Sequence, residues 1–229
     1  AVKDIQEQEL MRKASHLNDM AMAEITHFFK EGVTETDLAE QLKKIYRDLG
    51  ADGLSFEPLF AFGSNAASGH HWPDDTRLKP GDCILVDIGC TWEGYCSDMT
   101  RTFFYKNVTQ HQQEVYHTVL KANEEAEKAV TPGIPLSSLD QIARGIITDK
   151  GYGSAFTHRL GHFIGLEDHE FGDVSSASAD RAVPGNIFSI EPGIYLENDM
   201  GVRVEDLVLV TDHGHEILNH FSKELTVID

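Results

Sequence analysis

Basic residues are scarce in this chain. Its 229 residues include 19 lysines and arginines against 38 aspartates and glutamates, so the formal net charge at pH 7 is −19. An acidic surface repels phosphate backbones, and we therefore expect no nucleic-acid partner. The simplest consequence of this charge is solubility.

Cysteines are also few. The three cysteines all lie within residues 83–96, and their spacing is not that of a zinc knuckle. An odd, unpaired set argues against a disulfide framework. We expect small reduced core residues, which predicts a reducing compartment and a cytoplasmic location.

Long apolar runs are missing as well. No stretch approaches the roughly 20 apolar residues that cross a bilayer, and no signal peptide is visible, so we expect no membrane partner. The length is ample for a hydrophobic core, and no low-complexity linker divides the sequence. We therefore predict a single domain over residues 1–229.

Helical periods and strand-like runs alternate along the chain. Helices are predicted over 4–30, from the capping box at Thr34 to Gly50, over 110–130, and from Ser137 with Asp140 to near Gly151. Strand-like or extended segments are predicted over 54–64, 82–105 and 155–210. Two helices followed by carboxylate-bearing strands thus occur twice, although no residue-level repeat supports the pattern.

The most informative stretch is a buried-looking strand, residues 83–89, that ends in Asp87. Asp98 follows eleven residues later in a second strand-like run, and the bend at 92–94 predicts a hairpin between them. Both carboxylates alternate with apolar neighbours, so we expect them to point inward at one spot. A buried aspartate is costly unless it is paired or bound to a cation.

The second half adds further ionisable residues in apolar surroundings. Glu191 ends an apolar strand, Glu205 lies inside another, and His162 lies in a glycine-rich segment. Asp206 follows Glu205 directly and should point to the opposite face of its strand. Carboxylates with one histidine suit Mn²⁺, Co²⁺, Fe²⁺ or Zn²⁺, and the carboxylate excess favours two ions over one structural zinc.

Each of these residues has an ordinary structural interpretation. A single aspartate at a strand end is usually a turn or cap residue, and a histidine beside apolar residues is usually a satisfied core residue. Glu205 could pair with Arg203 or Arg101. Taken together, however, these carboxylates would leave a large uncompensated negative charge in the core, which a metal pair would neutralise.

Five short sequence blocks occur in the order and at the separations that are typical of one protein family. The blocks are Asp87-Ile88-Gly89, Ser97-Asp98-Met99-Thr100-Arg101, Gly161-His162-Phe163-Ile164-Gly165, Ile190-Glu191-Pro192-Gly193 and Arg203-Val204-Glu205-Asp206. Together they resemble the pita-bread metallopeptidases, which include prolidase, aminopeptidase P and methionine aminopeptidase. The resemblance implies an α/β fold with curved antiparallel strands around a dinuclear metal site and helices outside.

The resemblance also implies the roles of individual residues. The five metal ligands would be Asp87, Asp98, His162, Glu191 and Glu205, with Asp98 and Glu205 bridging two ions. The other site residues would be His70, His158, His169 and Arg203. Glu191 would also shuttle a proton, His158 and His169 would hydrogen-bond the substrate carbonyl, and His70 and Arg203 would position substrate. His71 is expected to be an exposed loop residue.

The flanks of these blocks look most like the proline-specific branch, so the implied substrate is a short peptide cut before proline. Two alternatives remain open: a methionine aminopeptidase, and a pita-bread module that binds peptide or protein without catalysis. Proline-specific members usually carry an extra N-terminal domain, whereas this chain starts directly at the first predicted helix. It is either a fragment or a single-domain member, and a homodimer is compatible with both.

Overall fold

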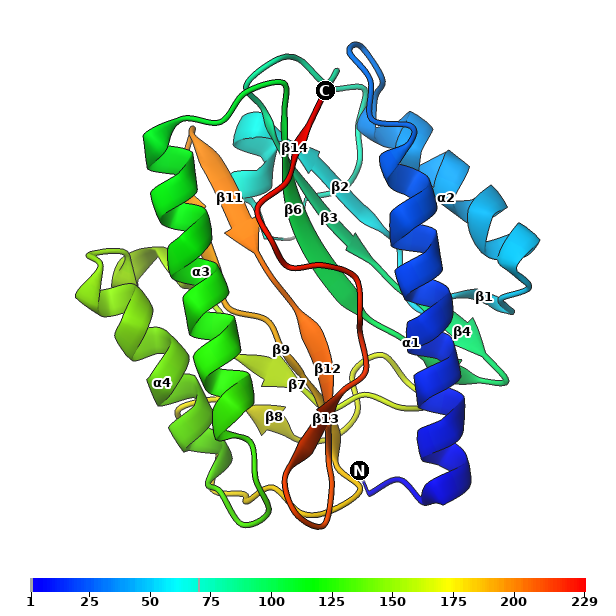
Figure 1. Cartoon of the computed structure of the whole chain (residues 1–229), viewed down its shortest axis with the longest axis vertical. Coiled ribbons are helices and arrows are strands. Elements are labelled where there is room, and N and C mark those ends of the chain that lie inside the picture. The colour runs from blue at the N-terminus through cyan, green and yellow to red at the C-terminus, as the bar shows by residue number, and fades with distance from the viewer. Residues whose placement is uncertain (1, 70) are drawn as a thin grey trace.

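The computed structural model describes residues 2–69 and 71–229. Two pairs of helices flank a set of short strands, and each pair precedes the strands of its half in the chain (Figure 1). The first pair is α1 (Ile5–Thr26) with α2 (Glu35–Leu49), and the second is α3 (Gln110–Ala129) with α4 (Leu136–Asp149). The predicted coarse repeat of two helices followed by strands is therefore present.

The strands of the first half are β1 (Gly53–Leu54), β2 (Leu59–Phe62), β3 (Cys83–Ile88), β4 (Cys90–Trp92), β5 (Tyr95–Cys96) and β6 (Met99–Tyr105). Those of the second half are β7 (Gly161–His162), β8 (Asp173–Val174), β9 (Ile187–Ile190), β10 (Gly193–Leu196), β11 (Met200–Arg203), β12 (Asp206–Val210), β13 (His215–Ile217) and β14 (Val227–Ile228). Two short 3₁₀ helices, η1 (Gly63–Ala67) and η2 (Gly153–Ala155), complete the described elements.

Side-chain caps start three of the four helices. Asp4, Thr34 and Thr109 each accept a bond from the third helical N–H, and the residue at that position bonds back to the cap. α1 ends at Thr26, earlier than predicted. Gly50 ends α2 in the left-handed region at a φ of 81°, as a C-terminal glycine should.

The predicted start of α4 at a Ser137 cap is wrong. The helix begins at Leu136, and the residue before it, Pro135, makes no side-chain cap bond. The Leu136 N–H instead bonds the carbonyl of Asp180, a partner that is distant in sequence. Asp140 is fully buried inside the helix and accepts two bonds from Arg144.

The alternation of side chains along β3 determines which way Asp87 points. Ile84, Val86 and Ile88 pack into the core cluster that contains the apolar faces of α1 and α2. Cys83 and Leu85 belong to the other cluster, which contains α3, α4 and the strands of the second half. Since side chains alternate along a strand, Asp87 continues this second row into the interior.

Strand pairing brings the other carboxylates to the same region. β3 and β6 are antiparallel with Asp87 opposite Thr100, and Asp98 lies just before β6. β9 and β12 are antiparallel with Ile190 opposite Asp206, so the adjacent residues Glu191 and Glu205 lie near each other. The Glu205 N–H donates to the carbonyl of Thr100 at 3.1 Å, which joins the two halves.

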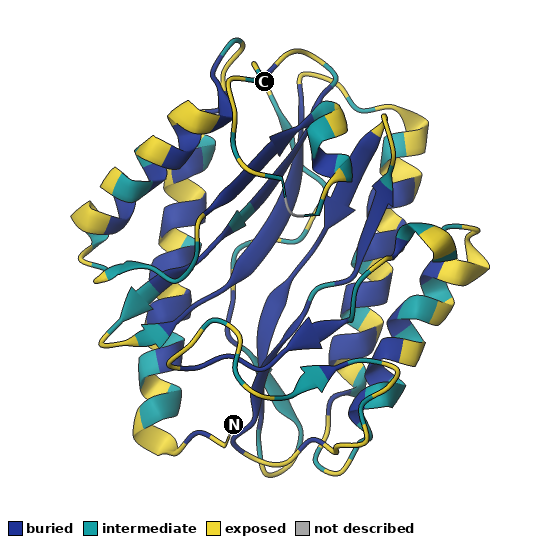
Figure 2. Cartoon of the chain, turned by 180° about the vertical axis from the view of Figure 1, so that it is seen from behind, coloured by how far each residue is buried: buried dark blue, intermediate teal, exposed yellow. Residues whose placement is uncertain are grey.

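The central strands β2, β3, β6, β9 and β12 are almost wholly buried, whereas the outward faces of the helices are exposed (Figure 2). The three cysteines are unpaired and buried, as predicted. Burial raises the pKa of the Cys83 thiol to about 12, so it stays protonated and inert. Among the described residues, no helix combines the length and the apolar composition needed to cross a membrane.

Candidate metal centre

The first half of the chain contributes two buried aspartates. Asp87 accepts a bond at Oδ2 from Arg203 Nη2 at 2.5 Å, while its buried Oδ1 has no partner among the described residues. Asp98 is 4% exposed, and its Oδ1 likewise has no described partner. Its Oδ2 lies 3.4 Å from Nε2 of His162. The two aspartates therefore face a common interior space, as the hairpin predicted.

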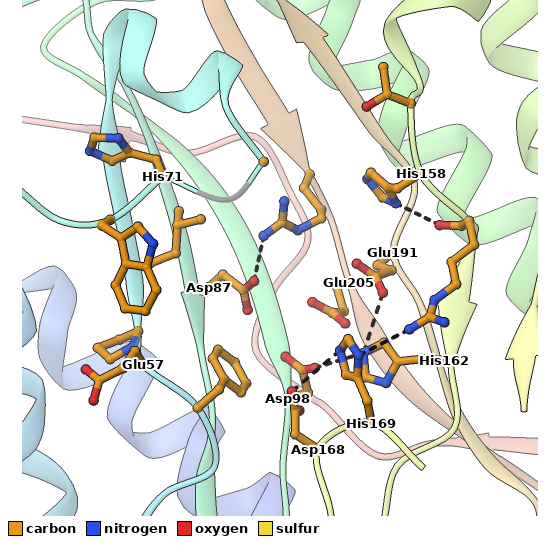
Figure 3. Close-up of a pocket in the computed structure, with 18 residues that line it drawn as sticks. Glu57, His71, Asp87, Asp98, His158, His162, Asp168, His169, Glu191 and Glu205 are labelled. Carbon is orange, nitrogen blue, oxygen red and sulfur yellow. Dashed lines mark hydrogen bonds and ion pairs between the residues drawn. The ribbon is translucent and has the colours of Figure 1, made fainter. Parts of the chain in front are cut away.

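The second half contributes the opposing wall. Glu205 is 1% exposed and accepts a bond at Oε2 from Thr100 at 2.6 Å, while its Oε1 has no described partner. Glu191 accepts a bond from Ser189 Oγ at 3.1 Å. Its Oε1 lies 3.6 Å from His162 Nε2. Figure 3 shows Asp98, Glu191, Glu205 and His162 converging, with Asp87 alongside.

His162 is oriented as a metal ligand would be. Its Nδ1 lies 3.2 Å from the carbonyl of Phe163, an acceptor only, so Nδ1 carries the proton. The lone pair of Nε2 then faces the carboxylates of Asp98 and Glu191. A backbone carbonyl that fixes the histidine tautomer in this way is common around metal ions.

The carboxylates crowd one another electrostatically. Burial, with the charges of Glu205 and Asp87, raises the pKa of Asp98 well above its usual range. Burial and the charge of Glu191 do the same to Glu205. Burial raises the pKa of Glu191 to about 7, although the charge of Arg203 opposes the shift. Burial lowers the pKa of His162, which favours its neutral, ligand-competent form.

These side chains fit divalent metal ions. Candidate ligand atoms of Asp98, His162 and Glu205 all lie within 4.8 Å of one another. Three buried oxygens without described partners point into the same region, and a cation would satisfy them and relieve the repulsion between carboxylates. Oxygen donors with one imidazole suit Mn²⁺, Co²⁺, Fe²⁺ or Zn²⁺.

We expect removal of bound metal to lower the melting temperature. An ion that binds only the folded state stabilises it by mass action, by about 2.7 kcal/mol per site at 100 times its Kd. Thermal unfolding before and after chelation, with metal content measured, tests this. An unchanged melting curve after complete metal removal would contradict a site made of these buried carboxylates.

Arg203 is 4% exposed and directed at protein atoms. Besides Asp87, it donates to Tyr195 at 2.7 Å and to Thr100 at 3.0 Å. These contacts hold the Asp87 carboxylate in place. The predicted role in positioning substrate stays a prediction.

His158 and His169 line the same cavity. His158 Nδ1 lies 2.7 Å from the carbonyl of Arg159, and its Nε2 lies 2.9 Å from the Tyr195 hydroxyl. The His169 ring is 3.9 Å from the His162 ring, centroid to centroid. His169 Nδ1 lies 3.2 Å from Arg159 Nη2. Because arginine can only donate, Nδ1 of His169 accepts, and its proton resides on Nε2.

The predictions for the adjacent residues His70 and His71 have different outcomes. His70 lies outside the described residues. The expectation that His71 is an exposed loop residue is wrong, because its side chain is 15% exposed and its Nε2 lies 2.6 Å from Glu35 Oε2. Glu35 is fully buried and also accepts bonds from the backbone N–H groups of Phe62 and Asp74. A buried carboxylate needs such donors, and His71 is one of them.

Substituting Glu35→Gln should therefore disturb more than the start of α2. We expect both Glu35→Gln and His71→Ala to loosen the loop over residues 71–74, since each weakens the buried contact between His71 and Glu35. Hydrogen exchange or limited proteolysis of that loop measures the effect. The exposed pair His27–Glu24 provides the control, and His27→Ala should leave protection unchanged. Equal protection in all variants would show that the contact between His71 and Glu35 does not hold this loop.

Residues from both halves enclose a cavity of about 540 Å³. Phe56, Trp72 and Asp168, none of which was predicted, line it with the candidate ligands. Burial raises the pKa of Asp168 to about 6, although the nearby His162 opposes the shift. The string Asp168-His169-Glu170 is visible in the sequence, but no local pattern indicates that Asp168 faces the cavity.

Comparison with known proteins now decides the family. The profile of metallopeptidase family M24 matches residues 9–212. The chain belongs to metallopeptidase family M24. The resemblance and the pita-bread fold that the sequence predicted are thereby confirmed, as is the expected metal dependence of the family.

Its M24 relatives include proteins with proline-related names. An uncharacterized peptidase from Staphylococcus aureus is 43% identical over 222 residues, which are 97% of this chain and 63% of the relative. The prolidase from Thermococcus sibiricus superposes with a TM-score of 0.97 at 37% identity, over 99% of this chain and 62% of that one. The X-Pro aminopeptidase from Thermotoga maritima gives 0.97 at 36% identity, over 99% and 64%. The chain thus spans somewhat less than two thirds of these M24 relatives.

Proposed function

We propose that this M24 domain is a metal-dependent exopeptidase that hydrolyses the first peptide bond of short peptides, with proline after the cut. The observation that carries the proposal is the convergence of five donors on one enclosed space. They are Asp87, Asp98, His162, Glu191 and Glu205, and three of them have a buried oxygen without a described partner. The names of the prolidase and X-Pro aminopeptidase structures support proline specificity.

These five residues would hold two divalent ions. When bound, such an ion pair supplies an activated water and charge stabilisation at neutral pH. Glu191 would take up and return a proton, and its buried carboxylate beside His162 in the cavity wall supports this role. Arg203 keeps Asp87 oriented through their 2.5 Å contact.

His169 is the candidate donor to the scissile carbonyl. Its Nε2–H is left as the donor because Nδ1 accepts from Arg159. A preorganised donor at this position stabilises negative charge as it develops on the carbonyl oxygen. His158 differs, because its Nδ1 donates to the Arg159 carbonyl and its Nε2 then accepts from the Tyr195 hydroxyl. Its predicted hydrogen bond to the substrate carbonyl stays a prediction.

Proline specificity requires recognition by shape. An Xaa-Pro bond has a ring nitrogen without N–H, so the substrate offers no amide donor there. Apolar side chains of Phe56, Leu59 and Trp72 line the cavity and give the ring a surface to pack against. We therefore propose this wall as the proline subsite.

Hydrolysis of a small peptide panel tests the function. The panel contains Ala-Pro, Ala-Ala and Met-Ala-Ser, assayed with Mn²⁺, Co²⁺ or Zn²⁺ and after chelation. We expect Ala-Pro to be cleaved fastest and only with metal. Preference for Met-Ala-Ser would instead indicate a methionine aminopeptidase. Bound metal without hydrolysis of any peptide would indicate a non-catalytic binding module.

A further inference from the structure

Asp168 lies in the cavity wall beside the candidate ligands, although no local sequence pattern indicates this position. It belongs to the connection between β7 and β8, and its side chain is 24% exposed. Its Oδ2 lies 3.5 Å from Nε2 of His169. Figure 3 places its carboxylate next to that of Asp98, beside the rings of His162 and His169.

The other oxygen of Asp168 shares a property with the candidate ligands. Its Oδ1 is buried and has no hydrogen-bond partner among the described residues. Asp87, Asp98 and Glu205 each have one such oxygen in the same cavity. A buried carboxylate oxygen without a donor is unfavourable unless a cation satisfies it.

Of the five candidate ligands, His162 also lies close to Asp168. Potential ligand atoms of His162, Asp168 and His169 lie within 4.8 Å of one another. His169 is a poor ligand in this arrangement, since its Nδ1 faces the Arg159 guanidinium and its Nε2 carries the proton. His162, by contrast, presents the Nε2 lone pair. An ion held by His162 therefore has Asp168 as a neighbouring anionic donor.

We propose that Asp168 is a sixth protein ligand of the metal centre, acting on the ion that His162 holds. The inference rests on the proposed function, because it presumes the two-ion site. The four carboxylates of the five-residue site already match the charge of two divalent ions, and Arg203 pairs with Asp87. Asp168 makes the site one charge more negative, which strengthens binding of the adjacent ion.

The test is Asp168→Asn, which keeps the side-chain shape and removes the charge. Titration of metal-free protein with Mn²⁺ by calorimetry should show that one ion binds about 10- to 100-fold more weakly. In the metal-free state the variant should melt at the same or a higher temperature, because a carboxylate that repels Asp98 has gone. The rise in melting temperature on adding Mn²⁺ should be smaller than in the wild type.

Glu167→Gln is the matched control, because it removes the same charge from the neighbouring exposed residue. It should bind Mn²⁺ as the wild type does. Unchanged Mn²⁺ affinity in Asp168→Asn would overturn the proposal. If the metal-free melting temperature also fell, the role of Asp168 would be structural. If the wild type binds only one ion, the two-ion function fails, while the affinity of that ion in Asp168→Asn still decides whether Asp168 is a ligand.

Discussion

Replacing Asp98 by asparagine should abolish metal binding and hydrolysis together. Its carboxylate is 6% exposed and lies between the two halves, 3.4 Å from His162 Nε2. Loss of a buried ligand charge should weaken metal binding by more than the roughly 100-fold typical of residues that only support ligands. Metal content after dialysis and Ala-Pro hydrolysis, measured on the same preparation, would show the two losses in parallel.

Glu205→Gln should likewise lose bound metal and hydrolysis together. The adjacent residue Asp206 provides a contrasting control. Asp206 points to the opposite face and lies 2.6 Å from Arg101 in a fully buried ion pair. Asp206→Asn should keep the bound metal but destabilise the fold, by about 3–5 kcal/mol, since Arg101 and Lys223 would lose the carboxylate that they share. If Asp98→Asn retains a full metal complement, or Asp206→Asn is the variant that sheds metal, the ligand assignment is wrong.

Local sequence patterns predicted most of the fold. The capping box at Thr34 gave the start of α2, since the bonds involved span only three residues. The alternation along β3 indicated that Asp87 points inward, because a strand places every second side chain on one face. The hairpin predicted from the bend at 92–94 likewise indicated that Asp87 and Asp98 lie close together.

Contacts between distant segments could not be predicted in this way. His71 and Glu35 are 36 positions apart, and nothing near either residue signals their bond. The bond between the Leu136 N–H and the Asp180 carbonyl, which replaces the expected Ser137 cap, also spans segments far apart in sequence. The position of Asp168 in the cavity wall could not be predicted either, because it depends on how distant segments pack.

Replacing His169 by alanine should separate turnover from metal binding. The side chain is 59% exposed, and in the proposed mechanism it donates Nε2–H to the substrate carbonyl. That hydrogen bond strengthens as negative charge develops on the oxygen, so its loss lowers the rate more than the affinity for substrate. We expect kcat for Ala-Pro to fall by about 10²- to 10³-fold.

The metal content and melting temperature of His169→Ala should stay close to those of the wild type. The tautomer set by Arg159 makes His169 a donor, and all five candidate ligands remain in place. His169→Gln, which retains an N–H donor, should recover part of the rate, while His213→Ala on an exposed loop should have no effect. Loss of metal from His169→Ala would show that His169 is a ligand, and the proton would then have to reside on Nδ1 despite the facing guanidinium.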